Sequence, residues 1–224
     1  MTELPKKLER LFLKLDCAAL SVEQCLSDLL FAVYGQNPDD AQAIIDGDEE
    51  IDRREVEIER ECIRLLALYQ PAAGDLRKIC FAIKVNNDLE RIADNCASSA
   101  KMLSILIKEE ISVNKFQAFR HLADCVVDAL HQTIRLISTN QEVPLAVSII
   151  RNDWKIVDPT YKKFLQEVFD GKEIIKDKAN SFYALTSIGR AFERIGDLCA
   201  NIAEDTVFLL TGEIVRHSLV GYDE

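Results

Sequence analysis

Two pairs of acidic residues combine the chemistry and the spacing of a metal-binding helix face. Glu90 precedes Asp94 and Glu193 precedes Asp197, each pair within a Glu-Arg-Ile-x-Asp stretch. Residues four apart are neighbours on one face of a helix, so each pair places two carboxylates side by side. Such a like-charged pair costs roughly 0.2–0.5 kcal/mol on a solvated surface, and more where the face is buried. The repulsion must be offset by a nearby Arg or Lys, by water or by a bound cation.

Further acids stand at related spacing on the preceding helical segments. Asp48 and Asp52 are also four residues apart. In the corresponding later segment, Asp153 is followed by Asp158, one residue out of step, and then by Pro159, which limits regular helix. We therefore expect the later segment to be a damaged version of the earlier one, with a weaker metal site.

If two such faces converge, four to six carboxylate oxygens surround one volume, a ligand set that suits the hard cations Mg²⁺, Ca²⁺, Mn²⁺ and Fe³⁺. The three His, at positions 121, 131 and 217, lie outside the acidic stripes, and no Glu-x-x-His step occurs. A ferritin-type di-iron site and a zinc hydrolase site are both disfavoured. The candidate metal ligands are Glu90, Asp94, Glu193, Asp197, Asp48, Asp52 and Asp153.

Other interpretations of the acidic faces remain open. They can be solvated surfaces of a purely structural helical module, or Arg91 and Arg194 can neutralise them by pairing with carboxylates across a bundle. A carboxylate-metal enzyme is a further alternative, but it needs a positioned base or nucleophile near the metal. The sequence offers no His near the stripes and no phosphate-binding G-x-x-x-x-G-K loop. A non-enzymatic protein is therefore favoured.

The elements that must position these residues are helices. Nearly every segment repeats apolar residues every three to four positions, the period of an amphipathic helix. With only 8 Gly and 5 Pro, the chain has too few turn-forming residues for an all-β sandwich or barrel. The pattern predicts an all-α fold of six long helices. Four lie over about 4–33, 38–69, 76–106 and 114–140, the fifth follows the fourth and ends near 169, and the sixth lies over about 179–210.

The chain also repeats itself. Residues 22–33 align with 126–137 at an offset of 104, and 43–48 align with 147–153 at an offset near 105. The Glu-Arg-Ile-x-Asp stretches align at an offset of 103. Three matches in one order predict two tandem three-helix bundles, residues 1–110 and 111–224, related by an internal repeat.

Composition narrows the classes of partner. Acids outnumber bases 38 to 27, and the net charge of −11 repels nucleic-acid backbones, so no nucleic-acid partner is expected. The seven Cys form no C-x-x-C pair, which favours reduced thiols and a cytoplasmic protein. The N-terminus leads into no signal segment, and no run of eighteen apolar residues occurs. Long amphipathic helices commonly leave an apolar seam, and we expect a homodimer.

Four stretches together resemble the PhoU family of phosphate-uptake regulators. They begin at Ile44 (Ile-Ile-Asp-Gly-Asp-Glu-Glu-Ile-Asp), Gln70 (Gln-Pro-Ala-Ala-Gly-Asp-Leu-Arg), Asp88 (Asp-Leu-Glu-Arg-Ile-Ala-Asp) and Phe192 (Phe-Glu-Arg-Ile-Gly-Asp). The resemblance covers most of the chain, including the duplication, and implies two three-helix bundles related by a pseudo-two-fold.

The resemblance also implies a role and a ligand set. Family members hold metal ions, including multinuclear iron clusters, on Glu/Asp-x-x-x-Asp motifs. These motifs correspond here to Glu90 with Asp94, Glu193 with Asp197 and Asp48 with Asp52. The family couples the ATPase of a phosphate ABC transporter to a membrane sensor histidine kinase and represses the phosphate-starvation response. The implied protein is a cytoplasmic, metal-binding adaptor that is only peripheral to membrane complexes.

Overall fold

The computed structural model describes residues 3–138, 142–171 and 178–215, and within these ranges every regular element is helical. The prediction of an all-α fold is therefore confirmed for the described part of the chain. The elements are α1 (Leu4–Gly35), α2 (Pro38–Tyr69), α3 (Ala73–Lys108), the 3₁₀ turn η1 (Val113–Lys115), α4 (Gln117–Ser138), α5 (Val143–Asn152), the π-helical turn η2 (Asp153–Val157), α6 (Asp158–Asp170) and α7 (Ala179–Thr211).

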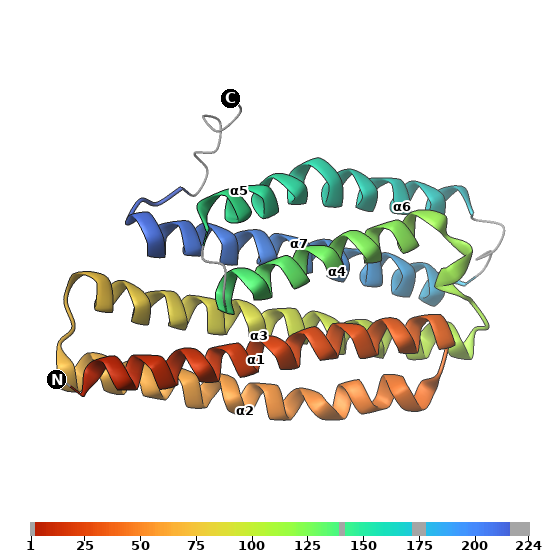
Figure 1. Cartoon of the computed structure of the whole chain (residues 1–224). Helices are drawn as coiled ribbons and strands as arrows, with labels where there is room; N and C mark the ends of the chain where they lie inside the picture. The colour runs from red at the N-terminus through yellow and green to blue at the C-terminus, as the bar shows by residue number, and fades with distance from the viewer. Residues whose placement is uncertain (1–2, 139–141, 172–177, 216–224) are drawn as a thin grey trace.

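Short breaks with local capping separate the first three helices. The side chain of Asn37 accepts a hydrogen bond from the backbone N–H of Asp39 at 3.0 Å, and Pro38 fills the first helical position of α2. Gln36 and Gln70 end α1 and α2 in the left-handed conformation, with φ of 50° and 44°. These tight connections reverse the chain twice, so α2 runs antiparallel to its neighbours (Figure 1).

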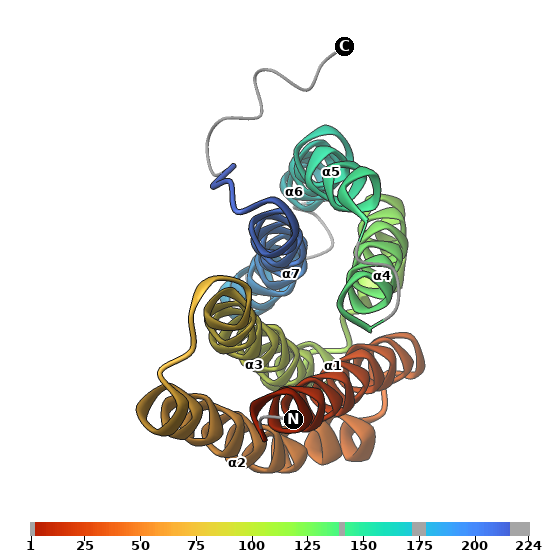
Figure 2. The same ribbon diagram turned by 60° about the vertical axis from the view of Figure 1, so that its left-hand side comes forward.

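The helices form two units of three. One unit is α1, α2 and α3; the other is α4, the continuous run α5–η2–α6, and α7 (Figure 1). Figure 2 shows α3 and α7 side by side where the units meet, with α1 next to α4. The predicted boundary between residues 110 and 111 falls in the connection from α3 to η1. The predicted end of the fourth helix at Asn140 lies outside the described residues.

The core continues through both units. It includes the fully buried rings of Phe81, Phe119, Phe164 and Phe192. Among the described residues, one helix, α1, is long and apolar enough by length and composition to cross a membrane. The apolar residues on the inner face of α1 pack in the core of the bundle. A core helix of this kind can be as long and as apolar as a membrane-spanning helix.

Candidate metal centres in two carboxylate clusters

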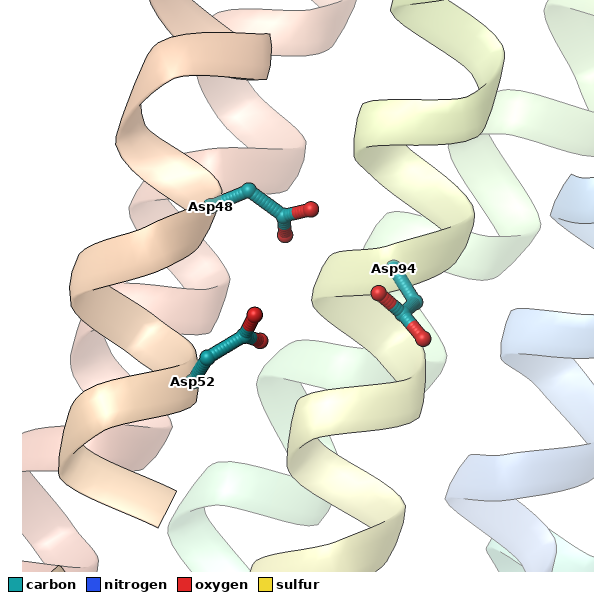
Figure 3. A group of neighbouring side chains, drawn as sticks. All are labelled: Asp48, Asp52 and Asp94. Atoms are coloured by element: carbon teal, nitrogen blue, oxygen red, sulfur yellow. The ribbon is translucent and has the colours of Figure 1, made fainter. Parts of the chain in front are cut away.

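The first carboxylate cluster joins α2 to α3. Asp48 and Asp52 lie one turn apart on α2 and face Asp94 on α3 (Figure 3). One carboxylate oxygen from each of the three lies within 4.8 Å of the others. Glu90 stands one turn before Asp94 and completes what we call the first cluster: Asp48, Asp52, Glu90 and Asp94. Both predicted i, i+4 pairs of this repeat therefore converge.

The electrostatics of this cluster are unfavourable without a cation. Burial, and then repulsion by surrounding carboxylates, raise the pKa of Glu90 to about 7. The carboxylates responsible, in decreasing order of effect, are Asp94, Asp52, Glu55 and Asp48. The pKa of Asp48 is also raised, chiefly by burial and then by the charges of Asp52 and Asp94. Near pH 7 the carboxyl of Glu90 is therefore only partly ionised, and a cation bound in the cluster would favour its ionised form.

A buried amide extends the first cluster by one more acid. The side-chain amide of Asn86, which is buried, donates to the backbone oxygen of Glu55 at 2.9 Å and to its carboxylate at 3.3 Å. This places the Glu55 carboxylate beside the other acids of α2. Burial, then the charges of Glu59 and Asp52, raise the pKa of Glu55. Glu55 was not among the predicted ligands, although its position one turn after Asp52 signals the shared face.

The second carboxylate cluster occupies the equivalent place between α6 and α7. Carboxylate oxygens of Asp158, Glu193 and Asp197 all lie within 4.8 Å of one another. Asp153 stands in the preceding π-turn, and the charges of Asp197, Asp158 and Glu193 all act on it. We define the second cluster as Asp153, Asp158, Glu193 and Asp197.

A π-turn accommodates the one-residue slip of the second repeat, and the weaker metal site expected there stays a prediction. The backbone N–H of Asp158 donates to the carbonyl oxygen of Asp153, the i→i+5 bond of a π-turn. A π-turn contains one more residue than an α-turn, so it accommodates the inserted residue. The offset between the repeats accordingly rises from 105, between Asp48 and Asp153, to 106, between Asp52 and Asp158. Asp158 thereby takes the place that Asp52 has in the first repeat. Asp158 was not among the ligands predicted from the sequence. The change of offset just before Pro159 indicated an inserted residue, and with that insertion Asp158 aligns with Asp52.

Asp153 is packed against α7 at a glycine. A Cβ added to Gly196 would lie 2.8 Å from Oδ1 of Asp153 and 2.9 Å from a methyl carbon of Val157. The first repeat has Ala93 at the equivalent position. Burial, then the charge of Asp197, raise the pKa of Asp153 to about 7. Burial and Asp197 also raise the pKa of Glu193, against the opposing effect of Arg190.

Arginine pairing across the bundle does not account for the acids. Arg91 pairs with Asp88 on its own helix at 3.2 Å, and Arg194 pairs with Asp197 on its own helix at 2.8 Å. Arg190 pairs with Glu193 at 3.3 Å. Two acceptor atoms of the second cluster, Oδ1 of Asp153 and Oε2 of Glu193, are nevertheless buried without a hydrogen-bond partner in the described structure. Orphaned buried acceptors of this kind are the atoms that a bound cation satisfies.

The donor set of both clusters is entirely carboxylate oxygen, which fits a hard cation and disfavours zinc. Among the histidines, the ring of His131 pairs with Glu23 at 2.9 Å and His121 lies beside Cys125, both on α4 and remote from the clusters in sequence. The histidine at position 217 lies outside the described residues. The residues present therefore fit Mg²⁺, Ca²⁺, Mn²⁺ or Fe³⁺.

Comparison with known proteins identifies the fold and its duplication. A family model described as the PhoU domain matches residues 18–103 and 119–206, one match in each three-helix unit. The chain belongs to the PhoU family. It is 34% identical over 198 residues to the phosphate-specific transport system accessory protein PhoU homolog of Aquifex aeolicus, covering 88% of this chain and 87% of that protein. It is 32% identical to PhoU of Escherichia coli, covering 91% and 82%.

Solved PhoU structures agree with this assignment. The crystal structure of PhoU from Pseudomonas aeruginosa matches with a TM-score of 0.87 at 30% identity, over 93% of this chain and 99% of that one. The regulatory protein PhoU from Streptococcus pneumoniae matches with a TM-score of 0.85 at 26% identity, over 95% and 99%. These relatives are named as accessory or regulatory proteins, which agrees with the prediction that the chain is not an enzyme.

Proposed function

We propose that this PhoU protein is a negative regulator of phosphate uptake and of the phosphate-starvation response. Two observations support the proposal: the family match spans both repeats, and the relatives are named accessory proteins of a phosphate-specific transport system. In this role the chain is an adaptor on the cytoplasmic side of the membrane. Its partners are the ATPase of a phosphate ABC transporter and a sensor histidine kinase.

The observation that carries the mechanism is the presence of an acidic cluster at the same place in both repeats. Asp48, Asp52, Glu90 and Asp94 would hold a cation in the first cluster, and Asp153, Asp158, Glu193 and Asp197 would hold one in the second. The cation, Fe³⁺, Mn²⁺, Mg²⁺ or Ca²⁺, would supply positive charge that offsets the repulsion among these acids. The carboxylates themselves tie α2 to α3 and α6 to α7, and so set the shape of the surface offered to partners.

The charge of the chain indicates what kind of surface it contacts. With a net charge of −11, it is attracted to basic partner surfaces, and these contacts weaken as ionic strength rises. Binding to the isolated transporter ATPase and to the cytoplasmic part of the kinase should therefore fall between low and high salt. Salt-independent binding to both would contradict this electrostatic model of docking.

The metal part of the proposal is tested by elemental analysis of purified variants. Asp94→Ala and Asp197→Ala should each lower the bound metal and the melting temperature in metal-replete buffer, because each removes a ligand from one cluster. Glu57→Ala is the matched control, since Glu57 is an exposed acid on α2 outside both clusters. Equal metal content in the wild type and both ligand variants would remove the metal role while leaving the family assignment intact.

The regulatory part is tested in a host that lacks its own PhoU protein. Expression of this chain should restore repression of a phosphate-starvation promoter in high phosphate, and the Asp94→Ala/Asp197→Ala double variant should restore it less. The Glu57→Ala control should behave as the wild type. Full repression by the double variant would separate regulation from metal binding, and no repression by the wild type would overturn the regulatory role.

A further inference from the structure

Two cysteine side chains meet between α1 and α3. Cys96 is fully buried in the core, and Cys25, which is half-buried, packs against the same core from α1. The thiol of Cys96 donates a hydrogen bond to the sulfur of Cys25. The two sulfurs are thus neighbours in the folded chain, although the cysteines are far apart in the sequence.

The register of the two helices independently places these cysteines at one level of the bundle. α1 and α3 run in the same direction (Figure 1), and the rings of Phe12 and Phe81 stack between them with centroids 6.0 Å apart. Cys25 follows Phe12 by thirteen residues, which is about 20 Å of helix. Cys96 follows Phe81 by fifteen residues, which is about 22 Å. Helix packing therefore brings the two positions alongside each other.

Cys25 also lines an open hollow between α1 and α2. The hollow has a volume of about 440 Å³, and its wall includes Ile44, Gly47 and Ile51 of α2. A Cβ added to Gly47 would meet no atom within 4 Å, so α2 leaves open space at this point of the wall. A small solute can reach the sulfur of Cys25 from the hollow, whereas Cys96, with an exposure of 0%, is shielded.

The hydrogen bond gives the two thiols different chemical roles. Because Cys96 is the donor, it stabilises negative charge on the sulfur of Cys25 and lowers the pKa of Cys25. Burial and the charges of Asp48 and Asp28 act in the opposite direction. The thiolate is the form of cysteine that attacks oxidants and other electrophiles. Cys25 is thus the nucleophile of the pair, and Cys96 is a second thiol held beside it.

The second repeat has a different arrangement at the equivalent place. Cys199 corresponds to Cys96 at the offset of 103, but Ala129 corresponds to Cys25 at the offset of 104. The side chain that hydrogen-bonds to Cys199 is the hydroxyl of Thr133. The repeat therefore folds without a thiol opposite its buried cysteine, and the thiol pair of the first repeat is not a requirement of the fold.

We propose that Cys25 and Cys96 are a peroxide-sensitive thiol pair, which closes reversibly to a disulfide between α1 and α3. The proposal requires no metal in either carboxylate cluster. In a reducing compartment such a bond is transient and acts in sensing, because the cell's thiols return it to the dithiol.

The reaction proceeds in two steps. The thiolate of Cys25 attacks one oxygen of hydrogen peroxide, the O–O bond breaks, and the other oxygen leaves as hydroxide, which takes up the proton released when Cys25 ionised. Cys25 is then a sulfenic acid. The sulfur of Cys96 attacks the sulfur of Cys25, the S–S bond forms, the S–O bond breaks, and the oxygen leaves as water with the proton of Cys96. One peroxide is reduced to water while two thiols are oxidised to one disulfide.

The bond is tested by peptide mapping of the full chain after treatment with hydrogen peroxide. The protein is kept in chelator, so that no bound metal catalyses the oxidation. Digestion with trypsin and a glutamyl endopeptidase separates Cys25 from Cys17, because Glu23 lies between them. The oxidised wild type should yield a peptide pair linked through Cys25 and Cys96, and dithiothreitol should remove the link. The same treatment in concentrated urea should lose this preference, because unfolding separates the two sulfurs.

Three variants test the roles of the two thiols. Cys25→Ser and Cys96→Ala should each abolish the linked peptide. In Cys96→Ala, Cys25 should stop at the sulfenic acid and accumulate a dimedone adduct that the wild type resolves to the disulfide. Cys17→Ser is the matched control, because Cys17 is an exposed cysteine of the same helix, and its substitution should leave the link intact. Circular dichroism verifies that each variant folds, and Cys25→Ser, at a half-buried position, tests the pair even where Cys96→Ala does not fold.

Four results would each overturn the proposal. They are the absence of a Cys25–Cys96 link in the oxidised wild type, an equal preference for this link in urea, oxidation of Cys17 ahead of Cys25, and preferential pairing of Cys25 with another cysteine.

Discussion

Replacing Asp153 by Asn should stabilise the metal-free protein at pH 8 and destabilise the metal-loaded protein. Asp153 is half-buried, its Oδ1 has no hydrogen-bond partner, and the closest charges acting on it are those of acids. Asn keeps the shape that fits beside Gly196 but carries no charge. The substitution therefore relieves repulsion when no cation is present and removes a ligand when one is.

The size of the effect follows from the raised pKa. An aspartate whose pKa rises from 3.8 to about 7 on folding opposes folding by up to about 4 kcal/mol once ionised. Asp153 keeps part of its contact with solvent, and screening by water and ions reduces this to roughly 1–2 kcal/mol. The Asp153→Asn variant should thus unfold at a higher urea concentration than the wild type at pH 8. At pH 4 most of the difference should be lost, because the native aspartate is then protonated and the pH is close to the unfolded pKa of 3.8.

The assay is urea denaturation followed by circular dichroism, at pH 4 and pH 8, in chelator and with added Mn²⁺. Glu57→Gln, which neutralises an exposed acid of α2, is the control and should change the free energy of unfolding by less than about 0.5 kcal/mol. An Asp153→Asn substitution that destabilises the chelated protein at pH 8 would refute the repulsion on which the cluster is built. An effect of the same sign and size with and without Mn²⁺ would refute the role of Asp153 as a ligand.

Three further predictions concern the same clusters. Gly196→Ala should lower the free energy of unfolding by about 1 kcal/mol, because the clash with Asp153 outweighs the better helix propensity of Ala. Gly47→Ala should instead raise it by roughly 0.5–1 kcal/mol, because the added Cβ meets open space. Both are measured in the same urea assay. In chelator, the raised pKa values of Glu90 and Asp153 mean that the native state binds more protons than the unfolded state between about pH 4 and 7, so stability should fall as pH rises through this range. Saturating Mn²⁺ should reduce that loss, and a stability that rises over this range in chelator would contradict it. Asp52→Asn should lower the metal content of the first cluster only. Elemental analysis should therefore find less metal in the Asp52→Asn/Asp197→Ala double variant than in the Asp197→Ala single variant.

Local sequence determined the helices and the acidic pairs. The apolar period and the Asn37-Pro38 break specify where helices run and turn, because capping and amphipathicity act over a few residues. The adjacency of Glu90 with Asp94 follows from helical geometry alone, whatever the helix packs against. The internal duplication could also be predicted from the sequence, because corresponding motifs of the two repeats are separated by nearly constant offsets.

Tertiary packing decided how those pairs meet. The insertion between Asp153 and Asp158 could bend, break or overwind a helix. In the folded chain it forms a π-turn that packs against α7 at Gly196 and places Asp158 in the second cluster. The raised pKa values of Glu90 and Asp153 likewise depend on burial and on carboxylates more than 30 residues away in sequence. Spacing along a chain defines which side chains share a helix face, whereas the surroundings of that face are set by helices that only the folded structure brings alongside.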